Sequence, residues 1–104
     1  MGAETFKTVG HGATANEAFD AAVSQAQYDH GHAGYTGTIA EKDEFSVISD
    51  SDGTSPEEAN ALADKLMDEQ DERIDDKWGP AGAIRFEAPG DMRQWWLFFG
   101  WASS

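Results

Sequence analysis

The chain has 104 residues, with 20 Asp and Glu against seven Lys and Arg, so its formal net charge is −13. A chain of this length supports one hydrophobic core, which excludes a multidomain enzyme and predicts a single domain over residues 1–104. The acidity excludes general nucleic-acid binding, because attraction to phosphates needs a basic surface. With 39% hydrophobic and 12% aromatic residues, the chain is too apolar for a disordered acidic protein.

The same composition limits where the protein works. Its longest apolar run, residues 95–99, is far shorter than the roughly 20 residues of a membrane-spanning helix. The N-terminus lacks the basic and apolar regions of a signal peptide, and there is no cysteine. We therefore expect a cytoplasmic protein that does not bind membranes.

The first part of the chain predicts a strand, a helix and a further extended segment. Residues 4–9 are rich in β-branched and aromatic types and run into glycines, which is typical of a strand that ends in a turn. Thr14 and Glu17 have the T-x-x-E spacing of a helix start, and an apolar stripe of helical period follows to about residue 30. Frequent glycines in residues 31–40 predict a loop that becomes a strand.

The second part predicts three strands and one helix. Residues 44–49 favour extended backbone. Ser55 and Pro56 start a second helix, whose apolar spacing continues into the mid-seventies. Residues 83–87 alternate between apolar and polar types, and residues 94–101 are apolar on both faces. The order β-α-β-β-α-β-β predicts an α+β, two-layer sandwich, with two helices on one face of a mostly antiparallel sheet.

The aromatic final strand raises the question of what covers the second face of that sheet. Two short helices on one face leave the other face exposed, and large exposed apolar patches are rare on monomers. Two interpretations stay open: loops of the same chain cover this face, or it is an interface with a second copy in a homo-oligomer or with another partner. The interface residues would be Trp95, Trp96, Phe98 and Trp101.

Two glycine-rich segments, residues 10–14 and 30–38, have the composition of an anion pocket. Free N–H groups at a helix start attract phosphate, glycine permits close approach, and hydroxyl and basic side chains complete such a site. The simpler alternative is two tight turns and a helix cap. The ligand of the pocket would be nucleotide-like, and its candidate residues are His11, Thr14, His32, Tyr35, Thr36, Thr38 and Lys42.

The three histidines, His11, His30 and His32, permit a zinc site only if they converge with a further ligand. Histidines scattered near turns are more often ordinary polar residues, so we assign no metal and no cofactor. No catalytic set of residues stands out either. A small hydrolase that uses a histidine as general base remains the weakest alternative, and we expect a protein that is not an enzyme.

Acidic residues are concentrated in residues 41–77, which contain 14 Asp and Glu and four Lys and Arg, a net charge of −10. Three of them have the i, i+4, i+8 spacing that places carboxylates on one helix face about 6 Å apart, similar to the phosphates of a DNA strand. This row predicts either a DNA-mimic surface or a solvated helix face that keeps the protein soluble. Its members are Asp64, Asp68 and Glu72.

Three longer strings carry a resemblance to a known group of proteins. YDHGHAGYTGTIAEK (28–42), DDKWGPAG (75–82) and LFFGWAS (97–103), together with residues 12–22, resemble small uncharacterised accessory proteins of tailed bacteriophages, especially those of actinobacteria. The resemblance implies a protein that acts in the cytoplasm of the infected host. By analogy it counters host defence. Our leading expectation is a non-enzymatic homo-oligomer that sequesters a nucleotide-like anion in the host cytoplasm. The alternative is an acidic DNA mimic that occludes a host DNA-binding or defence protein.

Overall fold

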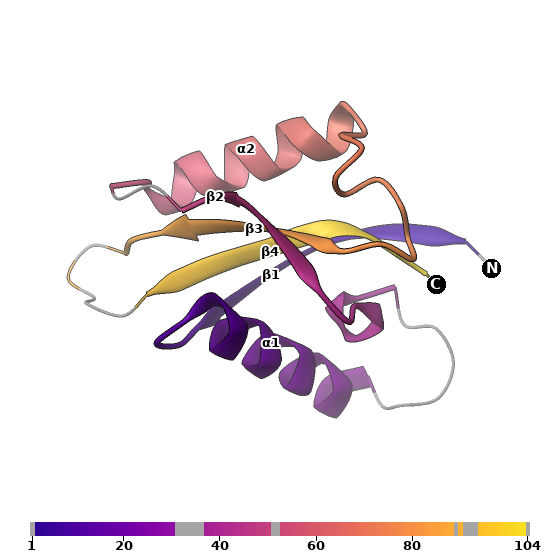
Figure 1. Cartoon of the computed structure of the whole chain (residues 1–104), viewed down its shortest axis with the longest axis horizontal. Coiled ribbons are helices and arrows are strands. Elements are labelled where there is room, and N and C mark those ends of the chain that lie inside the picture. Colours follow the sequence, from indigo (N-terminus) through magenta and orange to yellow (C-terminus); the bar gives the residue numbers. More distant parts are fainter. Residues whose placement is uncertain (1, 31–36, 51–52, 89, 91–93, 104) are drawn as a thin grey trace.

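The computed structural model describes residues 2–30, 37–50, 53–88, 90 and 94–103. These residues contain two α-helices, one short 3₁₀ helix and a four-stranded sheet, joined by turns and loops (Figure 1). In chain order they are β1 (Ala3–His11), α1 (Ala15–His30), η1 (Ile39–Glu41), β2 (Phe45–Ser49), α2 (Pro56–Asp68), β3 (Ala81–Phe86) and β4 (Trp95–Ser103). Neither helix in the described ranges is both long and apolar enough to cross a bilayer.

The sheet has the strand order β1-β4-β3-β2. Strand β4 pairs antiparallel with β1 on one side and with β3 on the other, whereas β2 joins the far edge parallel to β3. The predicted α+β class, the two helices and the mostly antiparallel sheet are confirmed.

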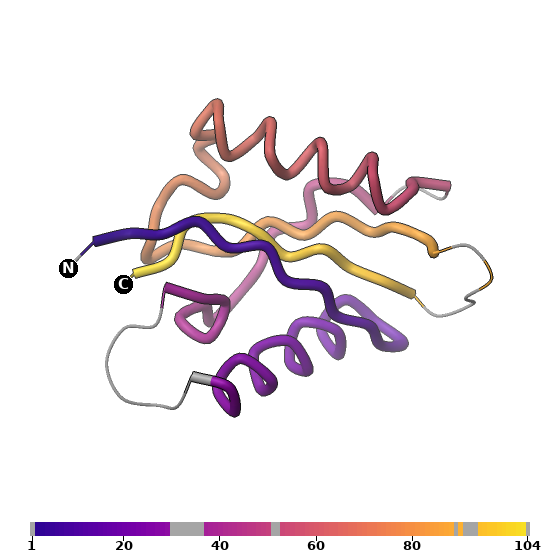
Figure 2. The backbone as a smooth tube through the Cα atoms, turned by 180° about the vertical axis from the view of Figure 1, so that it is seen from behind, coloured from indigo at the N-terminus to yellow at the C-terminus, as the bar shows by residue number. Residues whose placement is uncertain are grey.

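The predicted layers need a correction, because the helices lie on opposite faces of the sheet (Figures 1 and 2). Helix α1 packs on one face against Phe6, Trp96 and Phe98. Helix α2 packs on the other, against residues that include Ile84 and Phe99. The molecule therefore has three layers, with the sheet between two separate apolar clusters, because β4 has large side chains to bury on both sides.

The aromatic strand is accordingly core within this chain. Trp96 and Phe98 are 4% and 0% exposed beneath α1, and the half-buried Trp95 and Trp101 pack against the cluster beneath α2. The prediction of an interface at these four residues loses its basis, since the face assumed to be open is covered by the chain's own second helix.

The segment before β2 also differs from the prediction. Residues 31–36 lie outside the described part, and after Gly37 the chain forms the 3₁₀ turn η1. Thr38 caps this turn, because its hydroxyl accepts a hydrogen bond from the Ala40 N–H at 3.2 Å. Ile39 then inserts into the cluster beneath α1. The described sheet therefore has four strands, and Ile39 fills space in the core as part of a turn.

Both helices begin at the predicted caps. The Glu17 N–H donates to the Thr14 hydroxyl at 3.2 Å, and the Glu17 carboxylate accepts from the N–H of Ala13, one residue before the expected partner. Ser55 and Glu58 form a reciprocal capping box at the start of α2. Local sequence therefore sets both helix starts.

Helix α1 approaches β1 most closely at Gly10. A Cβ atom at this position would lie 2.5 Å from the Ala18 carbonyl oxygen and 3.4 Å from the Ala22 Cβ. Only a residue without a side chain permits this approach, so Gly10 sets the distance between strand and helix.

We predict that Gly10→Ala destabilises the protein by about 1–3 kcal/mol, because the added methyl must push α1 away from β1. Urea unfolding measures the change. Thr5→Val, which keeps the branched shape of an exposed residue on the same strand, should change the free energy of unfolding by less than about 0.5 kcal/mol. Equal stability of Gly10→Ala and the wild type would show that the contact is not tight.

Candidate functional site: a groove along strand β1

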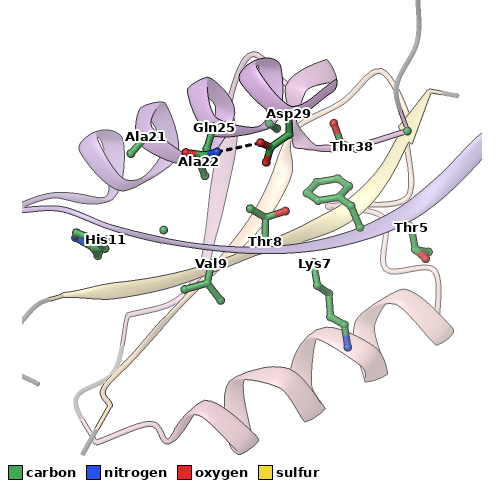
Figure 3. Close-up of a pocket in the computed structure, with 14 residues that line it drawn as sticks. Thr5, Lys7, Thr8, Val9, His11, Ala21, Ala22, Gln25, Asp29 and Thr38 are labelled. Carbon is green, nitrogen blue, oxygen red and sulfur yellow. Dashed lines mark hydrogen bonds between the residues drawn. The ribbon is translucent and has the colours of Figure 1, made fainter. Parts of the chain in front are cut away.

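A groove of about 480 Å³ runs between β1 and α1 (Figure 3). Its volume is within the range of ligand-binding pockets. One wall consists of seven consecutive strand residues, 5–11, and Gly37 and Thr38 also line the groove. The other wall belongs to α1 and consists of Ala21, Ala22, Gln25, Ala26 and Asp29.

The side chains on the α1 wall of the groove are small or polar, whereas the β1 wall also contains the larger apolar residues Phe6 and Val9. Three alanines of α1 leave space in front of the strand, and Thr8 points toward them (Figure 3). Gln25 donates a hydrogen bond to the Asp29 carboxylate at 3.1 Å. The groove is therefore an apolar trough with amide, hydroxyl and carboxylate groups.

The electrostatic character of the groove is acidic. Lys7 is the only Lys or Arg among its lining residues, and its side chain turns away toward α2 (Figure 3). There its ammonium group donates to Asn60 and to Asp64, each at 2.8 Å. Asp29 is exposed in the groove, and no described Lys or Arg among the lining residues points toward it. The described lining thus disfavours an anion.

The seven predicted anion ligands are only partly brought together. His11 and Thr38 line the groove. The His11 ring also packs edge-on against Trp95, with ring centroids 4.8 Å apart. Thr14 is the α1 cap and is not among the lining residues. The predictions for His32, Tyr35 and Thr36 lie outside the described residues.

Lys42 has a structural position that contradicts its predicted role. It is only 3% exposed, and its ammonium group donates to the backbone carbonyls of Asp76, Lys77 and Gly79 at 3.2, 3.3 and 2.8 Å. Burial lowers the pKa of Lys42, and the nearby Asp76 carboxylate acts in the opposite direction. Its three hydrogen bonds stabilise the turn before β3. Because the ammonium group is used in these bonds, Lys42 does not act as an anion ligand.

We predict that Lys42→Met destabilises the protein by about 2–4 kcal/mol, because three carbonyls lose their charged donor in a buried place. Thermal and urea unfolding measure this loss. Lys65→Met, at an exposed position of α2, is the matched control and should stay within about 0.5 kcal/mol of the wild type. Equal stability of Lys42→Met and the wild type would contradict the role of Lys42 in stabilising the turn before β3.

The predicted acidic row on the second helix is also corrected. Helix α2 ends at Asp68, and Gln70 has a φ of 52°, a left-handed conformation that turns the chain. Glu72 therefore lies beyond the helix, and Asp64 is paired with Lys7. The three carboxylates do not form one helical row, because hydrophobic periodicity continues past the point where the backbone turns.

The turn that follows α2 is held by Asp71 and Arg73. The Asp71 carboxylate accepts from the Arg73 guanidinium at 2.9 and 3.0 Å and from the Arg73 N–H at 2.9 Å. These bonds lower the pKa of Asp71 from 3.8 to about 2, and the side-chain bonds to Arg73 have the largest effect.

The lowered pKa means that the ionised Asp71 stabilises the fold above about pH 3.8, and that this contribution is lost as the pH falls toward 2. We predict that Asp71→Asn is less stable than the wild type at pH 5 and that the difference disappears near pH 2. Urea unfolding at a series of pH values measures it. A difference that is independent of pH would exclude the carboxylate as its source.

Metal binding finds no geometric support in the part of the chain that the structure describes, since no three His, Asp or Glu side chains there converge on one point. Of the three histidines, His11 lies in the groove. His32 and the side chain of His30 lie outside the description.

Comparison with known proteins adds no assignment: no protein-family model matches the chain, and neither a curated protein nor a solved structure shows significant similarity. Sequence reasoning did not identify the groove wall of residues 5–11 or the α1 alanines, whose shared site depends on β1 being an edge strand.

Proposed function

We propose that this protein is a non-catalytic, acidic binding protein that covers a positively charged surface of a partner protein. The observation that carries the proposal is that most carboxylates are exposed, whereas most cations are bonded to other groups of the same chain. Of the 18 described Asp and Glu residues, 15 are exposed, so carboxylates dominate the surface. The described cations are largely engaged within the chain, as for Lys7 with Asp64, Lys42 with three carbonyls and Arg73 with Asp71.

The resemblance to phage accessory proteins suggests the setting, which is a host protein in an infected bacterium. A host protein that binds DNA or a charged signal has the basic surface that such a partner needs. Occlusion of that surface is the mode of action that we propose. The charge is distributed over the surface and does not depend on a helical row of three carboxylates.

Sequestration of a nucleotide-like anion is the second candidate. The observation in its favour is that His11 and Thr38, two predicted ligands, line the same groove. The exposed Asp29 in that groove and the structural use of Lys42 weigh against it. Calorimetry with cyclic dinucleotides and ADP-ribose derivatives tests it directly: saturable heat favours sequestration over protein occlusion.

We predict that charge reversal weakens the partner complex in proportion to the charge removed. The test set is Asp68→Lys, Glu69→Lys and Glu72→Lys combined, all at exposed positions. The partner is identified by affinity purification from host cells and then titrated as a purified protein. Binding should weaken at least about tenfold for the triple variant and by a similar factor between 50 and 500 mM salt, because salt screens exposed charges.

The matched control replaces the same residues by amides, Asp68→Asn, Glu69→Gln and Glu72→Gln. This variant changes half as much charge at the same places and should weaken binding by an intermediate factor. Salt-independent binding, or equal affinity of all three proteins, contradicts the proposal.

A further inference from the structure

Strand β1 is a long edge strand with a regular backbone. It pairs with β4 without interruption from Ala3 opposite Ser103 to His11 opposite Trp95, and no described segment pairs with its other edge. The opposite edge of the sheet, β2, has only five residues and an irregular register between Val47 and Ser49. Short and bulged strands resist the addition of a further strand. Strand β1 has neither protection.

The groove follows this edge of β1. All seven residues 5–11 line it, although alternate side chains of a strand point to opposite faces. Their common feature is the backbone edge, which is what an added strand would contact. Seven residues extend for about 23 Å, enough for a segment of similar length.

Side chains leave room along the edge. The Lys7 ammonium group donates hydrogen bonds to Asn60 and Asp64 on the α2 side, so this side chain does not occupy the groove. Val9 is 49% exposed on that side and offers an apolar contact (Figure 3). On the α1 side three of the five wall residues are alanines, which leave space for the alternate side chains of a guest strand beside Gln25 and Asp29.

Charge indicates what kind of segment fits. Helix α1 contains Glu17, Asp20 and Asp29 but no Lys or Arg, and Asp29 lines the groove. A segment with Lys or Arg would compensate this charge, whereas an acidic segment would be repelled. A second copy of this chain carries the same net charge of −13 and so is disfavoured as the guest.

We propose that the outer edge of β1, with which no described segment pairs, together with the groove against α1, binds an extended, Lys- or Arg-bearing segment of a protein partner as a fifth strand. Backbone hydrogen bonds to the strand supply affinity, and the groove selects the side chains. The basic character of the segment rests on the proposed function, whereas its extended conformation rests on the edge and the groove.

The probe for this test is an acetylated and amidated peptide, Thr-Lys-Val-Lys-Val-Lys-Thr. A second version has N-methyl groups at alternate residues, on the edge that faces β1, and a third has Glu in place of Lys. Titrations are followed by the amide signals of residues 5–11 in NMR spectra. Binding of the first peptide should shift these signals and protect the edge amides from hydrogen exchange, whereas the N-methylated peptide should not bind.

Two pairs of variants separate contact from charge. Ala21→Trp fills the groove from an exposed helix position, and Ala61→Trp makes the same change at an exposed position of α2. We expect at least about tenfold weaker peptide binding for the first and no change for the second. Asp29→Lys and Asp68→Lys change the net charge equally, and only the first lies in the groove. It should weaken binding several-fold more.

The outcomes distinguish this inference from the proposed function. Equal binding of the N-methylated peptide, or of Ala21→Trp and the wild type, overturns strand addition. Salt-sensitive binding of the partner would then leave the proposed function intact. Equal affinity for the Glu peptide overturns a basic guest, whereas the charge-reversal and salt titrations with the partner test the proposed function separately. A wild-type dimer that Ala21→Trp converts to a monomer assigns the edge to a second copy and overturns the proposal.

Discussion

The structure depends on the burial of β4 on both faces. Its large side chains alternate, with Trp96 and Phe98 on one side and Leu97 and Phe99 on the other, and all four are buried. Such a strand is stable only in the interior of a sheet with apolar cover above and below. The central place of β4, between β1 and β3, and the separation of the two helices both follow from this constraint.

Covering two faces with two helices leaves parts of the sheet uncovered. A helix is about 10–12 Å wide and neighbouring strands are about 4.8 Å apart, so each helix covers about two strands. Helix α1 lies over β1 and β4, whereas α2 lies over β3 and β4. The outer edge of β1 therefore has α1 on one face and no described helix on the other, and this asymmetry creates the groove. Gly10 keeps α1 close to the strand at one end of it.

The distribution of charge is linked to this architecture. A chain with few cations uses several of them to hold its own backbone and helices, as Lys42 and Lys7 do. The carboxylates, which need hydration, lie outside. The cost is mutual repulsion at a net charge of −13, and a positively charged partner would relieve it. Under the proposed function, the surface carboxylates and the edge of β1, with which no described segment pairs, would both contribute to binding the partner.

Sequence alone determined elements that depend on neighbours along the chain: the four strands of the described sheet and both helix starts, where caps and alternation are local effects. It also predicted a strand within residues 31–40, where the described residues form the 3₁₀ turn η1. It further named His11 and Thr38, which line the groove, but as ligands of an anion pocket. Tertiary structure decided which face each helix covers, that Lys42 is buried beneath three carbonyls and that α2 stops at Asp68. These features depend on contacts between residues far apart in sequence, such as Lys42 with Gly79 or Gly10 against α1, and periodicity within one segment carries no information about them.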